Sequence, residues 1–310
     1  MPDQSTLSTP SCTPPTSLPI SGQVWLNGRL MPIEDASVNV LDHGLLYGDG
    51  CFEGIRVYDG RIFKLRSHLV RMNESARLLH IEPPYDIDAI EQAVRETVAA
   101  NEIDNGYIRL VYTRGCGTLG LNPFTCGTPQ VIIIAATISL YPEEMYVEGM
   151  PIIVAERPRI PIPCLDPRIK SLNYLNNILA KVEAINAGVL EALMLNQDGQ
   201  VAECTGDNVF IIKDGVISTP HTDAGILHGI TRRFVMTDVA PSLGYTVQER
   251  QVELDEVLSA DEVFLTGTAA EIIGVSRIGD QAVGTGQVGP ITTAMNEAFR
   301  RMVRTDAPED

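Results

Sequence analysis

Two side chains of this sequence have the types and surroundings that covalent chemistry on amines requires. Lys170 precedes a series of apolar residues spaced by three and four: Leu172, Leu175, Ile178, Leu179, Val182 and Ile185. This spacing predicts a helix that buries one face and stops at Gly188. A lysine just outside a helix N-terminus, in a pocket away from water, is biased toward the neutral amine that forms Schiff bases. Glu203 could hold a proton on the nitrogen of a pyridine ring. An isolated lysine beside a helix is more often a surface residue, so this assignment depends on further motifs.

The composition is that of a large acidic globular protein. With 310 residues and 44% hydrophobic content, the chain can bury enough surface for two domains. Its 40 acidic and 23 basic residues give a net charge of −17, which disfavours nucleic acid and anionic membranes as partners. No apolar run is long enough to suggest a membrane span. Six cysteines and five histidines lack the spacing of metal ligands, so we expect no metal, free thiols and a cytoplasmic protein.

The order of predicted elements indicates an α+β domain followed by an α/β domain. Hairpin dipeptides at Asn27-Gly28 and Asp59-Gly60 divide short apolar runs in the first 65 residues. Helical patterns at about 66–80 and 87–101 then alternate with strands near 107–112, 131–137 and 152–155.

A second series of elements follows a proline-rich segment. Three prolines between residues 157 and 163 predict a stiff, extended connector. Beyond the helix after Lys170, we expect hairpins at Asp198-Gly199 and Asp214-Gly215, a helix from Ile230, a strand at 262–265 and a helix from about Ile291. The predicted organisation is a flexible tail (1–20), a small N-terminal domain (21–156), a connector (157–165), a large C-terminal domain (166–304) and a short tail (305–310).

One glycine motif is misleading. Gly115-Cys116-Gly117-Thr118-Leu119-Gly120 fits the dinucleotide-binding pattern G-x-G-x-x-G and follows a predicted strand. That fingerprint also needs a helix starting at the last glycine and an acidic residue about 20 positions later, and the sequence has neither. We interpret the segment as a loop.

Two other segments could bind a phosphate group. Gly229 leads into the helix from Ile230, so the first free amides and the Thr231 hydroxyl could bind one anion. The Thr266-Gly267-Thr268-Ala269 turn after a strand has the same character. The first segment alone could equally be an ordinary helix N-cap, and the second alone is better interpreted as a plain strand-to-helix turn with a capping hydroxyl.

The N-terminal half contains a candidate site for a carboxylate. Tyr107 and Arg109 lie two residues apart on a predicted strand, so their side chains share one face and could bind one carboxylate together. The simpler interpretation is a cross-strand aromatic beside a solvated arginine.

Together these motifs resemble the class IV, fold-type IV pyridoxal phosphate enzymes, and within them the branched-chain amino acid aminotransferases. The resemblance extends from about residue 22 to residue 303. It implies a small α+β domain, a larger α/β domain and pyridoxal 5'-phosphate bound between them. It also implies transamination of Leu, Ile and Val with 2-oxoglutarate or glutamate, in a homo-oligomer whose site is completed by the neighbouring subunit.

The same resemblance implies roles for individual residues. Lys170 would carry the Schiff base and shuttle protons, and Glu203 would pair with the pyridine nitrogen. The other residues implied to bind the cofactor are Arg71, Ile230, Thr231 and Thr268 at the phosphate, Leu227 against the ring, and Tyr174. Those implied to bind the substrate are Tyr47, Phe52, Gly54, Tyr107, Arg109, Leu121, Thr268 and Ala269, with Leu121 reaching the neighbouring subunit's site and Tyr174 also walling the apolar pocket.

Two related activities on the same fold stay open. Ser171-Leu172-Asn173 after the lysine also occurs in D-amino acid aminotransferases, although the stretch 112–123 lacks the Arg-x-His carboxylate trap in which those enzymes resemble one another. Aminodeoxychorismate lyase is a further alternative, and it would release pyruvate without an amino acceptor.

Overall fold

The first sheet and its two helices use the predicted hairpins and helical patterns. The computed structural model describes residues 21–137 and 141–305, so the predicted tail at 1–20 lies outside the described residues. Turns at Asn27-Gly28 and Asp59-Gly60, all with positive φ, connect two pairs of antiparallel strands. The sheet has the order β2-β1-β6-β5-β3-β4, with bounds Gln23–Leu26 (β1), Arg29–Pro32 (β2), Gly50–Tyr58 (β3), Arg61–Ile62 (β4), Gly106–Thr113 (β5) and Gln130–Ala136 (β6).

Two amphipathic helices pack on this sheet, α2 (Leu65–Leu78) and α3 (Ile87–Ala100), and bury an apolar core against it. Asp86 caps α3 by accepting a hydrogen bond from the amide of Ala89 at 2.8 Å. The remaining short helices of this part are η1 (Ile33–Asp35), α1 (His43–Tyr47) and η2 (Pro123–Thr125). Both α2 and α3 lie within two residues of their predicted bounds.

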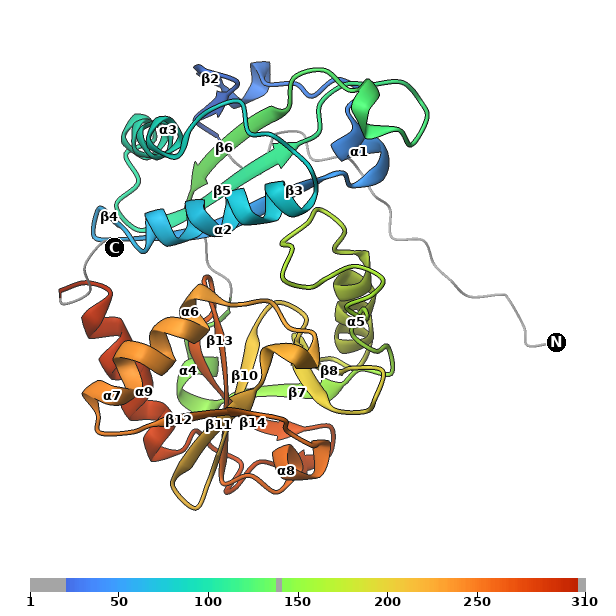
Figure 1. The fold of residues 1–310 in the computed structure, drawn as a ribbon. Coiled ribbons are helices and arrows are strands. Elements are labelled where there is room, and N and C mark those ends of the chain that lie inside the picture. The colour runs from blue at the N-terminus through green and yellow to red at the C-terminus, as the bar shows by residue number, and fades with distance from the viewer. Residues whose placement is uncertain (1–20, 138–140, 306–310) are drawn as a thin grey trace, which may run out of the picture.

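A larger, mixed sheet forms the second part of the chain (Figure 1). Its order is β12-β11-β10-β13-β14-β7-β8-β9, with β15 paired to β14. The strand bounds are Met150–Val154 (β7), Glu191–Leu195 (β8), Val201–Cys204 (β9), Asn208–Lys213 (β10), Val216–Pro220 (β11), Val247–Arg250 (β12), Glu262–Gly267 (β13), Glu271–Ile278 (β14) and Gln281–Ala282 (β15). The hairpins predicted at Asp198-Gly199 and Asp214-Gly215 connect β8 to β9 and β10 to β11. The two-domain α+β and α/β prediction is thereby confirmed.

Helices flank the larger sheet, and the helix predicted from Ile230 is continuous but changes its hydrogen bonding. It runs as α6 (Ile230–Phe234), the π-helix η4 (Val235–Val239) and α7 (Ala240–Ser242). The other helices are α4 (Glu144–Glu148), α5 (Leu175–Asn186), η3 (Thr222–Ala224), α8 (Leu254–Leu258) and α9 (Pro290–Met302). Among residues 21–137 and 141–305, no helix is long and apolar enough to cross a membrane.

The domain prediction is wrong for one strand. The predicted small domain, 21–156, included the strand near 152–155, but β7 lies in the larger sheet. It pairs in parallel with β14 on one side and β8 on the other. The change from one sheet to the other therefore falls between β6 and β7, before the proline-rich segment.

The expected burial of α5 is also wrong. Leu175, Ile178, Val182 and Ile185 are 44–64% exposed in the single chain. The helix instead packs through Ala180 and Ala184, whose small side chains let it lie close to β8. An apolar stripe along α5 is consequently left facing solvent.

The glycine-rich segment at 115–120 is a loop, as predicted. It joins β5 to β6 and is followed by the short helix η2, with no α-helix starting at Gly120. A dinucleotide fingerprint would need such a helix.

Candidate active site

A cavity of about 310 Å³ lies between the two sheets and collects most of the predicted site residues. Gly54, Arg71 and Tyr107 come from the first part of the chain. The second part contributes Lys170, Tyr174, Leu227, Ile230, Thr231, Thr268 and Ala269. Residues far apart in sequence therefore meet in one cavity, because both sheets and the segments before α5 and α6 contribute to its lining.

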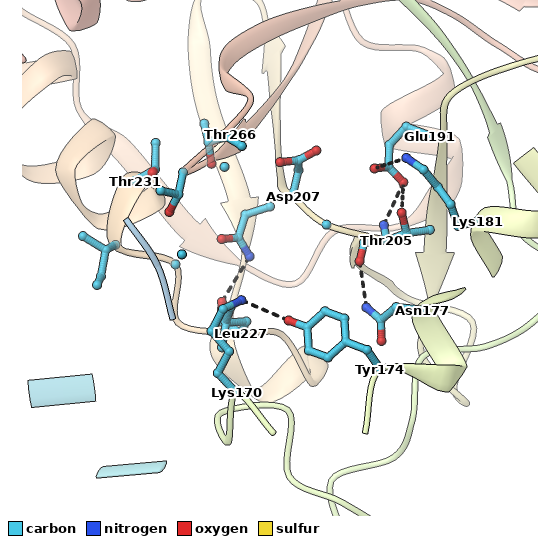
Figure 2. A pocket seen from close by; sticks show the side chains of 18 of the residues that line it. Lys170, Tyr174, Asn177, Lys181, Glu191, Thr205, Asp207, Leu227, Thr231 and Thr266 are labelled. Carbon is cyan, nitrogen blue, oxygen red and sulfur yellow. Dashed lines mark hydrogen bonds and ion pairs between the residues drawn. The ribbon is translucent and has the colours of Figure 1, made fainter. Parts of the chain in front are cut away.

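The Lys170 amine projects into this cavity beside two aromatic rings. Its Nζ donates a hydrogen bond to the Tyr174 hydroxyl at 3.0 Å, as Figure 2 shows. It also lies 4.6 Å from the centroid of the Phe52 ring, and Phe52 and Tyr174 contact each other edge to face. The Lys170 backbone is fixed as well, since its carbonyl accepts from the Phe52 amide and its amide donates to the Ser75 hydroxyl. The amine is therefore held in a defined place before any ligand binds.

Glu203 is a buried carboxylate with three hydrogen-bond donors. Arg159 donates from Nε at 2.8 Å, the Leu227 amide at 3.0 Å and the Asn208 side chain at 3.1 Å. Burial raises the pKa of Glu203 above its ordinary value, and Arg159 opposes that effect. Because the Leu227 amide binds Glu203 directly, this carboxylate lies immediately beneath the Leu227 wall of the cavity.

Arg71 is fixed by a second buried carboxylate. Its Nε and Nη2 each donate to Glu53 at 2.7 Å, and its Nη1 donates to the His228 carbonyl at 2.8 Å. His68 binds Glu53 at 2.7 Å. Burial alone would raise the pKa of Glu53. Arg71 and His68 outweigh that effect and hold the pKa of Glu53 well below its ordinary range. The guanidinium thus reaches the loop that leads into α6.

The start of α6 presents free amides toward the cavity. Gly229 is the N-cap residue and supplies no side-chain hydrogen bond, so the first amides of the helix remain available to an anion. A Cβ at Gly229 would lie 2.0 Å from Oδ1 of Asn208, which explains why glycine occupies this position. In Figure 2 Thr231 and Thr266 lie together at this end of the cavity, on the side away from Tyr174. The Oγ1 of Thr266 is buried and lacks a hydrogen-bond partner among the residues that the structure describes.

Several predicted substrate residues lie at the margin of the cavity or outside it. The Arg109 guanidinium lies over the rings of Phe52 and Tyr107, at 4.5 and 5.3 Å from their centroids. The Tyr47 hydroxyl donates to the Leu119 carbonyl in the β5–β6 loop. Leu121 in the same loop is 79% exposed and does not line this chain's cavity.

Sequence reasoning missed a second group of polar residues at the cavity. Glu191, Thr205 and Asp207 are buried and cluster with the half-buried Lys181 on the side of Asn177 (Figure 2). Glu191 accepts from the Thr205 amide at 2.9 Å and pairs with Lys181 at 3.4 Å. Burial and the neighbouring Glu191 raise the pKa of Asp207 to about 7. Only their separate positions along the chain are visible in the sequence, so no spacing could have revealed the cluster.

Arg159 was missed for a different reason. It lies in the proline-rich segment, which has no regular secondary structure, and we interpreted that segment only as a connector. A buried Glu203 requires a cationic partner, and this requirement was a usable signal. The sequence could not identify which arginine meets it.

Comparison with known proteins agrees with this geometry. The family model described as "Amino-transferase class IV" matches residues 50–278. A protein of Methanocaldococcus jannaschii is 45% identical over 90% of this chain and 95% of its own length. The branched-chain-amino-acid aminotransferase of Pseudomonas aeruginosa is 38% identical over 91% of this chain and 93% of its own length.

Solved structures extend the likeness to three dimensions. The branched-chain aminotransferase of Thermoproteus uzoniensis, solved with norvaline, superposes with a TM-score of 0.85 and 38% identity, covering 91% of this chain and 95% of that one. The branched-chain amino acid aminotransferase of Thermobaculum terrenum, solved in its pyridoxal phosphate form, has a TM-score of 0.84 and 33% identity, covering 91% of this chain and 94% of that one. On the family match and these relatives, the chain belongs to the class IV aminotransferases.

Proposed function

We propose that this protein transfers amino groups between the branched-chain L-amino acids Leu, Ile and Val and 2-oxoglutarate, with pyridoxal 5'-phosphate as cofactor. The observation that supports it most is the placement of the Lys170 amine in the cavity and of Glu203, held by Arg159, against the Leu227 backbone that walls it. The relatives named as branched-chain-amino-acid aminotransferases, at 34–38% identity, support the choice of substrate.

The residues present fit this cofactor. One phosphate would be bound by the free amides at the start of α6, by Arg71 and by the Thr266 hydroxyl, which has no hydrogen-bond partner in the described part of the chain. A pyridine nitrogen would be met by Glu203 beneath Leu227. When bound, the cofactor supplies a ring that takes up electrons from the substrate Cα.

The protein's own groups would then manage protons and orientation. In the first half-reaction, Lys170 Nζ takes a proton from Cα of the amino donor. In the second half-reaction, it delivers a proton to Cα of the amino acceptor. Glu203 would pair with the protonated ring nitrogen, and Arg159, 2.8 Å away, favours the ionised form of this carboxylate against the effect of burial. Tyr107 and the Thr268-Ala269 turn would bind the α-carboxylate, while Phe52, Tyr174 and Gly54 would shape the side-chain pocket, with Arg109 reserved for the second carboxylate of glutamate.

An amino-donor screen tests the proposal. With 2-oxoglutarate as acceptor, L-Leu, L-Ile and L-Val should each yield glutamate, and D-alanine should not. Preferential turnover of D-alanine would transfer the assignment to a D-amino acid aminotransferase. Release of pyruvate from aminodeoxychorismate without any amino acceptor would transfer it to the lyase.

We further propose a homo-oligomer, at least a dimer, in the cytoplasm. The support is the exposed apolar stripe of α5 together with the loop residues Leu119, Leu121 and Phe124, which are 72–83% exposed. The five cysteines within the described residues are free thiols, as in reducing compartments. Ile178→Asp with Val182→Asp should yield a monomer by light scattering, and cell fractionation tests the location.

Subunit mixing tests whether a neighbour completes the site. Lys170→Ala and Leu121→Asp subunits should each be inactive alone. Refolded together, they should regain activity, because one mixed site would combine an intact Lys170 with an intact loop. If activity does not return on mixing, Leu121 acts within its own subunit, either in catalysis or in folding.

A further inference from the structure

We propose that the groove between α2 and α6 is a second anion-binding site, which takes a small molecule carrying a diphosphate or similarly charged phosphate group. The groove has a volume of about 770 Å³ and is lined by residues of α2, of α6 and η4, and by Arg168 and Thr222. Figure 1 shows α2 of the first domain lying opposite α6 of the second. A ligand in this groove would therefore touch both domains.

The charge of the groove is opposite to that of the chain. The chain carries a net charge of −17. The groove nevertheless gathers two acidic residues, Glu74 and Glu249, against six lysines and arginines: Lys64, Arg66, Arg71, Arg168, Arg232 and Arg233. Such a concentration of cations on an acidic protein produces a local field that attracts anions.

Part of this charge is already neutralised, and part is not. Arg66 pairs with Asp88 and Glu91, and Arg168 pairs with Asp166. Arg71 pairs with Glu53 and Arg232 with Glu249, so four of the six cations have acidic partners. The side chains of Lys64 and Arg233, in contrast, make no hydrogen bond or ion pair with another residue in the described part of the chain. The Lys64 amine lies only over the face of the Phe234 ring, at 5.7 Å from its centroid. These two cations come from different domains and are available to a ligand.

Arg232 adds a buried donor to the same wall. Its side chain is 6% exposed, and its Nη2 binds the Pro220 carbonyl at 2.9 Å and Glu249 at 3.0 Å. Its Nε is buried and has no hydrogen-bond partner among residues 21–137 and 141–305. A buried donor without a partner is unfavourable, so the wall of the groove contains an unsatisfied cationic group.

The backbone at Lys64 is unusual in the same place. Lys64 has φ 52° and ψ 39°, the left-handed region that non-glycine residues rarely adopt, immediately before α2. Strained backbone of this kind often occurs at ligand sites. Here it sets the direction in which the lysine leaves the helix start.

The chemistry of these groups selects the ligand. Guanidinium donors and a lysine spread over two helices match an anion with several oxygens and more than one charge, which a diphosphate has and a lone carboxylate lacks. The groove adjoins the proposed cofactor site, because Arg71, Gly229 and Ile230 line both cavities. A bound diphosphate would hold α2 and α6 together beside the cofactor phosphate.

Calorimetric titration of the cofactor-loaded enzyme with inorganic pyrophosphate tests the site, because loading fills the cofactor's own phosphate position. We expect saturable one-site binding at fixed ionic strength, together with a higher melting temperature. Lys64→Ala and Arg233→Ala should each weaken binding roughly tenfold or more, since each removes a charged donor. Arg29→Ala, an exposed arginine on β2 outside the groove, should bind pyrophosphate like the parent.

Two competitors then identify the source of the phosphate. Displacement of pyrophosphate by pyridoxamine 5'-phosphate would indicate a cofactor-loading site, and displacement by a nucleoside diphosphate would indicate a nucleotide site. Transamination by the loaded enzyme should be unchanged in Lys64→Ala and Arg233→Ala. Absence of saturable binding, or equal binding by both variants and the parent, would overturn the proposal without affecting the assigned transamination.

Discussion

Arg159 places its Nε 2.8 Å from Oε1 of Glu203, and both side chains are more than nine-tenths buried. Removing one partner of an ion pair so deeply buried destabilises the folded protein, by roughly 3–5 kcal/mol. Removing Arg159 would also change the chemistry of Glu203. Arg159 opposes the burial that raises the pKa of Glu203, so it helps to keep the carboxylate ionised.

Arg159→Gln should therefore shift the acidic limb of the kcat profile to higher pH. Without the guanidinium, the pKa of Glu203 rises further, and the ionised carboxylate is populated only at higher pH. Measurement of kcat against pH checks this. Arg157→Gln is the control, because Arg157 lies on the same segment but pairs with Glu183 instead of Glu203.

A double variant separates this effect from loss of structure. Glu203→Gln alone should keep the cofactor but lose most of kcat, since an amide cannot hold the proton of the ring nitrogen. In that background, Arg159→Gln should no longer move the pH profile. A profile that still moves would mean that Arg159 acts through another group.

Lys170→Ala should abolish both the covalent attachment of the cofactor and turnover. The cavity contains a second lysine, Lys181, whose Nζ pairs with Glu191 at 3.4 Å. Borohydride reduction followed by peptide mapping distinguishes the two, and Lys181→Gln is the matched control that should keep the link. Label recovered on Lys181 in the parent protein would contradict the assignment of Lys170.

The parts of the fold that the sequence predicts well are those with local causes. Helices α2 and α3 follow their apolar periodicity, and Asp86 marks the start of α3. The hairpins follow their Asn-Gly and Asp-Gly turns. The candidate site was predictable where a motif combines a residue type with a neighbouring element, as for Lys170 and the start of α6.

The errors occur where burial depends on partners distant in sequence. Nothing local reveals that β7 pairs with β14, more than 100 residues later, or that Arg159 meets Glu203. The periodicity of α5 correctly indicates an apolar face, but the periodicity does not say what covers it. In the single chain that face is exposed while the alanine face is buried.

Asp207 should make stability depend on pH near neutrality. Its pKa is raised to about 7 by burial and by Glu191, from an unfolded value of about 3.9, so the folded state holds the proton more tightly. The corresponding stability is fully present below pH ~4 and is lost as the pH rises through about 7. Lys181 and Tyr141 also face this carboxyl and oppose the shift.

Asp207→Asn should remove that pH dependence. Relative to the parent, the variant should gain stability between pH 5 and pH 8, by up to a few kcal/mol at about 1.36 kcal/mol per pKa unit. Chemical denaturation at the two pH values measures the difference, with Asp198→Asn in an exposed turn as control. A parent and variant whose stabilities change in parallel would show that Asp207 is already ionised at pH 5.

Arg109 should distinguish the two substrates of the reaction. Its guanidinium lies over Phe52 and Tyr107, at the edge of the pocket proposed for the side chain. If it binds the distal carboxylate of glutamate, Arg109→Ala should slow the half-reactions of glutamate and 2-oxoglutarate far more than that of leucine. Loss of a charged hydrogen-bonding partner typically costs about 2–5 kcal/mol, so the selective loss should be on the order of a hundredfold.

Stopped-flow rates for each half-reaction provide the comparison. Arg109→Lys keeps the charge but not the planar fork, so its rates should lie between those of the parent and Arg109→Ala. Equal losses for leucine and glutamate would instead assign Arg109 to the α-carboxylate or to the packing of Phe52.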